Sequence, residues 1–273
     1  MLRGNITVSR LAWDVVRQRH GVEEQHHVLA VEHGSNVAGG DEVIIRDAYA
    51  ELERIGLGQG YQAHPDLVST IALLSRPMQE LHGWFGHQGR GDNLIGFVAA
   101  TDGRDAALAT LDEHNFHVVP IAPDRLPEAV ARLLPDSPPS PGRSLTMPVE
   151  LLDGVTNNKQ PERPRYPQDD EDGDGQSWMV GATKQEDPDL RAIKELLKQP
   201  RRGLARIYAA GRDQMGRRAK TSRPLLVLDT EQGRWLMQVR PERSGQEWAV
   251  VLPAGRERIE QAAQQMLATL QPH

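Results

Sequence analysis

The sequence predicts an α+β fold built from two similar halves related by a quasi-two-fold arrangement. Each half contains short strand-like segments separated by tight turns, and each series ends in an amphipathic helix introduced by a proline. Between the halves, Asn157 to Gln176 combines prolines with like charges and has too little apolar surface to offset the entropy of ordering. We therefore expect a single domain whose halves are residues 1–155 and 178–273, joined by a disordered acidic and proline-rich loop at 156–177.

The first half is expected to begin with helices and to continue into an antiparallel meander. Apolar residues at helical spacing, and Pro65 at a first-turn position, indicate the early helices, whereas Asp102-Gly103 is a typical turn between neighbouring strands. The expected helices are Val8 to His20, Asp41 to Ile55, Pro65 to Leu74 and Asp124 to Leu134, and the expected strands are His27 to Glu32, Asn93 to Thr101, Ala106 to Leu111 and Phe116 to Ile121.

The second half repeats this order. Its expected strands are Leu204 to Ala210, Leu225 to Asp229, Trp235 to Arg240 and Glu247 to Leu252. Pro253 is then expected to open a closing helix, because the following apolar residues recur at i, i+3, i+4 and i+7. That apolar stripe consists of Ile259, Ala262, Ala263, Met266, Leu267 and Leu270.

Composition excludes several classes of protein. The 273 residues include no cysteine, which excludes disulfides and thiolate chemistry. The formal charge of -6 argues against a nucleic-acid partner, and the arginine-rich stretch Arg201 to Arg223 is interpreted as the solvated rim of a hairpin. The start, Met1 to Trp13, lacks the apolar core of a signal peptide, and no apolar run is long enough to span a membrane. A cytoplasmic protein without membrane insertion is expected.

No metal site is predicted. His26, His27 and His33 lie on or beside one expected strand, where side chains alternate between faces and cannot readily share an ion. His82 and His87 are five residues apart in a glycine-rich stretch that we interpret as a loop. The segment from Asp170 matches the first half of an EF-hand calcium loop, but its twelfth position is Gly181 instead of a bidentate Glu.

No catalytic constellation is predicted either, and neither is a cofactor. The GHQGRG stretch at 86–91 fits neither a dinucleotide-binding motif nor a P-loop, and the chain has no G-x-S-x-G motif. Asp213 and Asp229 are candidates for paired carboxylates, but Asp229 precedes Thr230 and Gly233, a pattern that an Asx-type turn explains.

The second half contains a series of motifs in a distinctive order: Asp229-Thr230, Gly233-Arg234-Trp235, and then Glu247-Trp248 before Val251 and Pro253. These motifs resemble the "DT..GRY" and "W..V.P" signature of the EspG family, the substrate-specific chaperones of type VII (ESX) secretion systems, with Trp235 in place of the usual Tyr. In the first half, the stretch from Leu134-Pro135 through Pro138 to Gly142 and Pro148 to Leu152 is similar to the family's mid-chain region. The resemblance extends from about Leu11 to Leu270.

The resemblance implies a cytosolic protein with a central antiparallel sheet, two helical bundles and pseudo-two-fold symmetry. It also implies a chaperone that covers the apolar tip of helical PE/PPE-like heterodimers and keeps them soluble for export, with the secretion machinery as a second partner and a monomer or weak homodimer as the free form. A non-catalytic regulatory or structural interaction protein of the same fold is the alternative, and a small-molecule hydrolase is a third interpretation.

Candidate partner-binding residues lie in the signature region. Trp235 and Trp248 are interpreted either as core packing between sheet and helix or as anchors for a partner helix. Alternation along the strand places Trp235, Met237 and Val239 on one face. The expected partner-binding set is Arg234, Trp235, Met237, Val239 and Trp248, with Arg234 and Arg240 at the rim of the contact.

Overall fold

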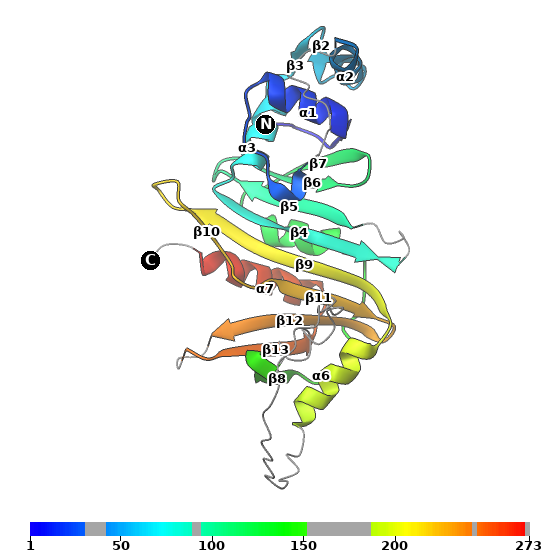
Figure 1. Cartoon of the computed structure of the whole chain (residues 1–273), viewed down its shortest axis with the longest axis vertical. Helices are drawn as coiled ribbons and strands as arrows, with labels where there is room; N and C mark the ends of the chain where they lie inside the picture. The colour runs from blue at the N-terminus through cyan, green and yellow to red at the C-terminus, as the bar shows by residue number, and fades with distance from the viewer. Residues whose placement is uncertain (31–41, 89–93, 152–186, 242–244, 271–273) are drawn as a thin grey trace, which may run out of the picture.

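The computed structural model describes residues 1–30, 42–88, 94–151, 187–241 and 245–270. One large antiparallel sheet runs along the long axis of the molecule (Figure 1). The 11 strands include β10 (Arg218–Lys220), which pairs with one end of β9. The other strands follow in spatial order: β1 (Ile6–Ser9), β7 (Asn115–Ile121), β6 (Ala106–Leu111), β5 (Ile95–Thr101), β4 (Gln79–His87), β9 (Arg201–Arg212), β11 (Leu225–Thr230), β12 (Gly233–Pro241), β13 (Glu247–Pro253) and β8 (Leu145–Pro148).

The two halves of the chain meet in the middle of this sheet, where β4 lies beside β9. Their register pairs Gln79 with Gly211 and continues to His87 opposite Gly203. Gly83 allows this close approach, because a Cβ built there would lie 1.8 Å from the carbonyl oxygen of Arg206. The central contact between the halves therefore requires glycine at position 83, because any side chain there would collide with β9.

The helices cover both faces of the sheet. On one face, α4 (Leu126–Leu133) and α7 (Arg256–Ala268) pack against each other over the central strands and enclose a single apolar core. On the opposite face, α1 (Arg10–Arg19), α2 (Glu42–Arg54) and α3 (Pro65–Ser75) cover the first strands. The helix α6 (Pro188–Lys198) covers a separate apolar core against β8, β12 and β13 (Figure 1). A short hairpin, β2 (Gly58–Gln59) and β3 (Gln62–Ala63), follows α2.

Most expected elements are present with small shifts at their ends, but three assignments were wrong. The expected strand at His27 to Glu32 is, in its described part, the 3-10 helix η1 (His27–Leu29). This turn buries the neighbouring side chains of Val28 and Leu29 against the first apolar core. Residues beyond Ala30 in that segment lie outside the described part of the chain.

The other two corrections concern β4 and α7. The stretch with His82 and His87 is a central strand and not a loop, because its glycines serve close strand packing. Pro253 is the last residue of β13, and the helix starts three residues later, after the N-cap Gly255. The extended backbone of β13 continues through Pro253, and beyond it the Ala254 N–H donates to the Arg234 carbonyl of β12 at 3.1 Å.

In the described part of the chain, five further strands and one helix were not expected: β1, β2, β3, β8, β10 and α6. The expected disordered loop at 156–177, with the acidic stretch that begins at Asp170, lies outside the described residues. None of the helices in the described part of the chain has the length and hydropathy that crossing a bilayer requires.

Candidate functional site

The predicted partner-binding residues all lie on β12 and β13, but the sheet divides them between its two faces. Met237 pairs with Val251 and Val239 pairs with Ala249, so these side chains share the face that α6 covers. Trp235 lies on the same face of β12. Trp248 pairs with Arg240 and therefore points to the opposite face, where α7 lies. The sequence placed the strands correctly, yet it did not show that the two tryptophans are on different sides.

On the α6 side, Trp235, Met237 and Val239 are neither fully buried nor fully exposed. They border the apolar core formed by α6, β8 and the last strands. The Trp235 ring also covers Gly142, where a Cβ would come within 2.8 Å of the ring. Trp235 is therefore half-buried, with its ring packed partly against the protein, and its role as an anchor for a partner stays a prediction.

On the α7 side, the end of β12 borders an open groove of about 580 Å³. One wall is the C-terminal half of α7 and the residue Leu270 after it, and the other is the segment from Lys220 to Leu225. Arg240 and Glu247 also line the groove. The groove therefore combines apolar side chains such as Met266 and Leu270 with polar and charged ones.

Arg234 does not lie at a rim. Its side chain is 2% exposed, and its guanidinium donates to both carboxylate oxygens of Asp229, at 2.5 and 2.8 Å. The same group donates to the Pro135 carbonyl at 2.7 Å. The expected rim role is therefore wrong for Arg234, and the expected Asx-type turn is wrong for Asp229, since its carboxylate is committed to this buried ion pair.

The rest of the Asp-Thr and Gly-Arg motif stabilises the same corner. Thr230 Oγ1 accepts from the Gln232 N–H and donates to the Gly233 carbonyl, closing the turn between β11 and β12. Gly233 has a φ angle of 129°. A Cβ atom added at this position would lie only 2.7 Å from the Ser140 Cα, so a side chain has no room there. Backbone hydrogen bonds of Arg234 to Pro138 and Ser140 then hold the segment after α4 against β12. The motif that identifies the second half is thus a structural junction between β11, β12 and residues 135–142.

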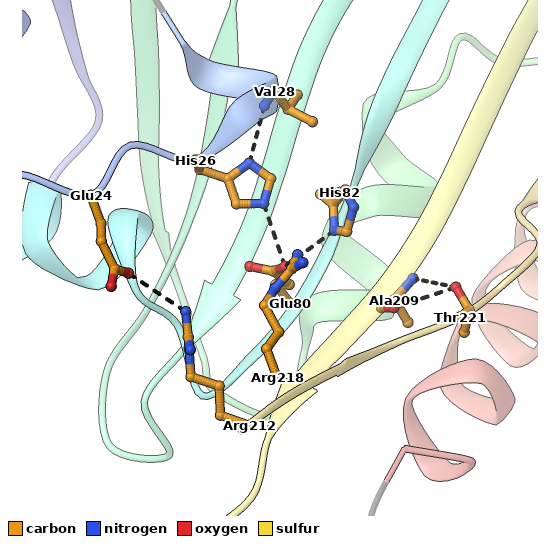
Figure 2. A network of polar contacts seen from close by, with 9 residues as sticks. All are labelled: Glu24, His26, Val28, Glu80, His82, Ala209, Arg212, Arg218 and Thr221. Carbon is orange, nitrogen blue, oxygen red and sulfur yellow. Dashed lines mark hydrogen bonds and ion pairs between the residues drawn. The ribbon is translucent and has the colours of Figure 1, made fainter. Parts of the chain in front are cut away.

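A buried polar cluster that the sequence did not predict lies on the face of α1, α2, α3 and α6, at the central strands. Glu80 and His82 project from β4, His26 precedes η1, and Arg218 reaches in from β10 (Figure 2). Arg218 donates to Glu80 Oε1, while His26 Nε2 and His82 Nδ1 each lie 3.4 Å from that oxygen. Arg218 therefore binds a buried carboxylate and is not simply part of a solvated hairpin rim.

The electrostatics of the cluster follow from burial and from these contacts. Burial alone would raise the pKa of Glu80, but the polar contacts and charges of His26 and Arg218 outweigh it and hold the pKa at about 2. Burial lowers the pKa of His82 to about 3, against a smaller opposing effect of the Glu80 charge. At neutral pH the cluster contains an ionised carboxylate beside a neutral imidazole.

Other candidate residues are not assembled into a site. Asp213 caps the turn between β9 and β10 and pairs with Arg217, whereas Asp229 is held by Arg234, so the two carboxylates do not act together. His27 packs against the rings of His26 and His82, and His87 lies at the far end of β4. His33 lies outside the described residues.

Comparisons with known proteins agree with this architecture. The solved structure of the type VII secretion system chaperone EspG5 of Mycobacterium tuberculosis, in complex with a PE25–PPE41 dimer, superposes with a TM-score of 0.67. The match covers 98% of this chain and 97% of that chain at 13% sequence identity, which establishes a shared fold. No curated protein matches at a significant level. The sequence profile of the EspG family matches residues 9–265, and the chain therefore belongs to the EspG family.

Proposed function

We propose that this protein is a cytoplasmic chaperone that binds helical type VII secretion substrates of the PE/PPE type and keeps them soluble for export. The observation that carries the proposal is membership of the EspG family over residues 9–265. A whole-chain match to a chaperone solved with its PE25–PPE41 dimer supports it. This role requires only that the chaperone binds non-covalently over an apolar surface of the substrate, because that surface would otherwise drive aggregation.

A non-enzymatic role agrees with the chemistry of the described residues. Among them, the buried carboxylates of Glu80 and Asp229 are each bound by an arginine side chain. Neither carboxylate is paired with a hydroxyl nucleophile in the hydrogen bonds of the site. A protein of this kind acts by binding, and its free form is proposed to be a monomer or weak homodimer that also contacts the secretion machinery.

The proposed architecture has two related halves, residues 1–155 and 178–273, separated by a loop at 156–177. The packing of α4 against α7 supports it, because each helix follows the meander of its own half and both lie on one face. The α1, α2 and α3 group and the α6 region are the proposed helical bundles at the two ends of the other face.

The partner surface is proposed to include the half-buried row Trp235, Met237 and Val239 on the α6 side. A helix that lies across this row would use the apolar side chains as anchors, in the manner of helix-in-groove recognition. Trp248 provides a second apolar contact on the opposite face, beside exposed Arg240. Because the two tryptophans point in opposite directions, their separate replacement reports which face binds.

The experiment is co-expression of the chain with PE/PPE-like pairs encoded near its gene, followed by size-exclusion chromatography. We expect co-elution and rescue of substrate solubility, with little loss of complex at high salt because apolar anchors dominate. Trp235→Ala should weaken binding by about 2 kcal/mol, or roughly 30-fold, whereas Arg240→Ala should have a small effect. Trp248→Ala is the matched aromatic control on the other face.

Thermal melts must show that each variant remains folded. A loss of binding in Trp248→Ala alone would move the surface to the α7 groove. If every tested substrate stays insoluble and none co-elutes, the chaperone assignment fails. An interaction protein of the same fold without a secretion role would then be favoured.

A further inference from the structure

Three buried side chains with metal-binding atoms converge between β4 and the residue before η1. The side chains of His26, Glu80 and His82 are 5%, 2% and 4% exposed. Within the described part of the chain, His26 Nε2, His82 Nδ1 and Glu80 Oε2 have no hydrogen-bond partner. Since buried polar atoms nearly always have partners, three unpaired atoms in one small cluster are unusual. Both nitrogens lie 3.4 Å from Glu80 Oε1, the carboxylate oxygen that also accepts from Arg218. Figure 2 shows the two imidazoles pointing at the carboxylate from separate elements.

The spacing of these atoms fits ligands of a shared ion better than hydrogen bonds. Each histidine nitrogen lies 3.4 Å from Glu80 Oε1, beyond the usual N–H···O range of about 2.7 to 3.2 Å. Two ligands on a tetrahedral ion with bonds of about 2.1 Å are separated by about 3.4 Å. One ligand atom from each of the three residues lies within 4.8 Å of the others.

We propose that His26, Glu80 and His82 form a binding site for one zinc-class divalent ion. Two imidazole nitrogens and a carboxylate oxygen are a ligand set that Zn²⁺ and Co²⁺ accept, whereas Mg²⁺ and Ca²⁺ favour oxygen ligands throughout. The burial of the site makes the ion a structural link between the segment before η1 and the central strand.

Two neighbouring groups set the affinity. The Val28 N–H donates to His26 Nδ1 in a long contact of 3.3 Å. Zinc binding through Nε2 requires that the ring proton sit on Nδ1, which can then no longer accept. The contact with Val28 must therefore break when zinc binds. Arg218 places a positive charge on Glu80 Oε1 and opposes a second cation nearby. Removing the charge of Arg218 should therefore strengthen zinc binding. If the cluster serves only as an ion pair between Arg218 and Glu80, the same change would lower the stability of the protein and would not produce zinc binding.

The test uses the full chain without a histidine tag, stripped of metal by a chelator. Isothermal titration with ZnCl₂ and metal analysis after dialysis should both give one zinc per chain. CoCl₂ should produce the visible absorption bands of a low-symmetry cobalt site, and MgCl₂ should not bind. Glu80→Gln and His82→Gln should each lower zinc affinity at least about tenfold. Arg218→Gln should raise the affinity, and His87→Gln on the same strand, outside the cluster, should leave it unchanged.

The proposal is overturned if the wild-type chain binds no stoichiometric zinc. It is also overturned if His82→Gln retains full affinity, or if His87→Gln lowers affinity as much as His82→Gln does. If Glu80→Gln fails to fold, the cobalt absorption spectra of the wild-type chain and of His82→Gln are compared instead. Identical spectra would show that His82 is not a ligand and would refute the proposed site. None of these readouts depends on partner binding, so the outcome is separate from that of the chaperone proposal.

Discussion

The buried ion pair between Arg234 and Asp229 leads to the sharpest stability prediction. Replacing Arg234 with methionine retains much of the volume of the side chain but removes all three hydrogen bonds from its guanidinium. The Asp229 carboxylate, whose side chain is 10% exposed, would lose its arginine partner, and the Pro135 carbonyl would lose its donor. Breaking a buried pair from one side costs about 3 to 5 kcal/mol.

That loss should lower the melting temperature by roughly 6 to 20 °C, at about 2 to 4 °C per kcal/mol for a domain of this size. Thermal and urea unfolding followed by circular dichroism measure it. Adding Asp229→Asn should cost less than the sum of the two single changes, because the second change removes the unpaired charge. Arg240→Met, an exposed control on the same strand, should change stability by no more than about 0.5 kcal/mol. A melting temperature of Arg234→Met within about 2 °C of wild type, or strict additivity in the double variant, would refute the reasoning.

Two further changes test the packing of the halves. Leu267→Asp puts a carboxylate into the core beneath α7, where Leu267 is 6% exposed, and should destabilise the protein by at least about 3 kcal/mol. An unchanged melt would mean that this stripe faces solvent or a partner instead. Gly83→Ala places a methyl group against the Arg206 carbonyl and should abolish soluble expression, whereas Gly4→Ala, with no atom within 4 Å of the added Cβ, should not. Soluble Gly83→Ala with a wild-type melt would contradict the close contact between β4 and β9.

The elements that the sequence predicted well are those with strong local signals. The strand Ala106–Leu111 agrees at both ends because turn residues bound it, and the stripe of α7 follows helical spacing throughout. By contrast, β4 carries glycine, histidine and tryptophan residues whose place in a strand depends on the neighbouring β9. Short strands such as β8 have too few residues to show a period, and β8 is defined by its pairing with β13.

The candidate site shows the same limit more clearly. The ordered motifs, among them the one with Asp229, Gly233 and Arg234, pointed to the family, but motif order carries no information on burial. Arg234 was therefore placed at a rim, although the structure buries it against Asp229. Alternation correctly grouped Trp235 with Met237, yet the opposite orientation of Trp248 depends on the register between β12 and β13.

The sequence by itself determined the family, the two meanders with their closing helices, and the lack of thiol chemistry, because composition, short-range periodicity and ordered motifs are local properties. Only the tertiary structure decided which polar groups meet. His26, Glu80 and Arg218 are far apart along the chain. The pairing of β4 with β9 and of β9 with β10 brings Glu80 and Arg218 together, and the packing of η1 on β4 and β5 adds His26. Their interaction depends on distance and burial in the folded protein, and neither quantity can be read from residue order.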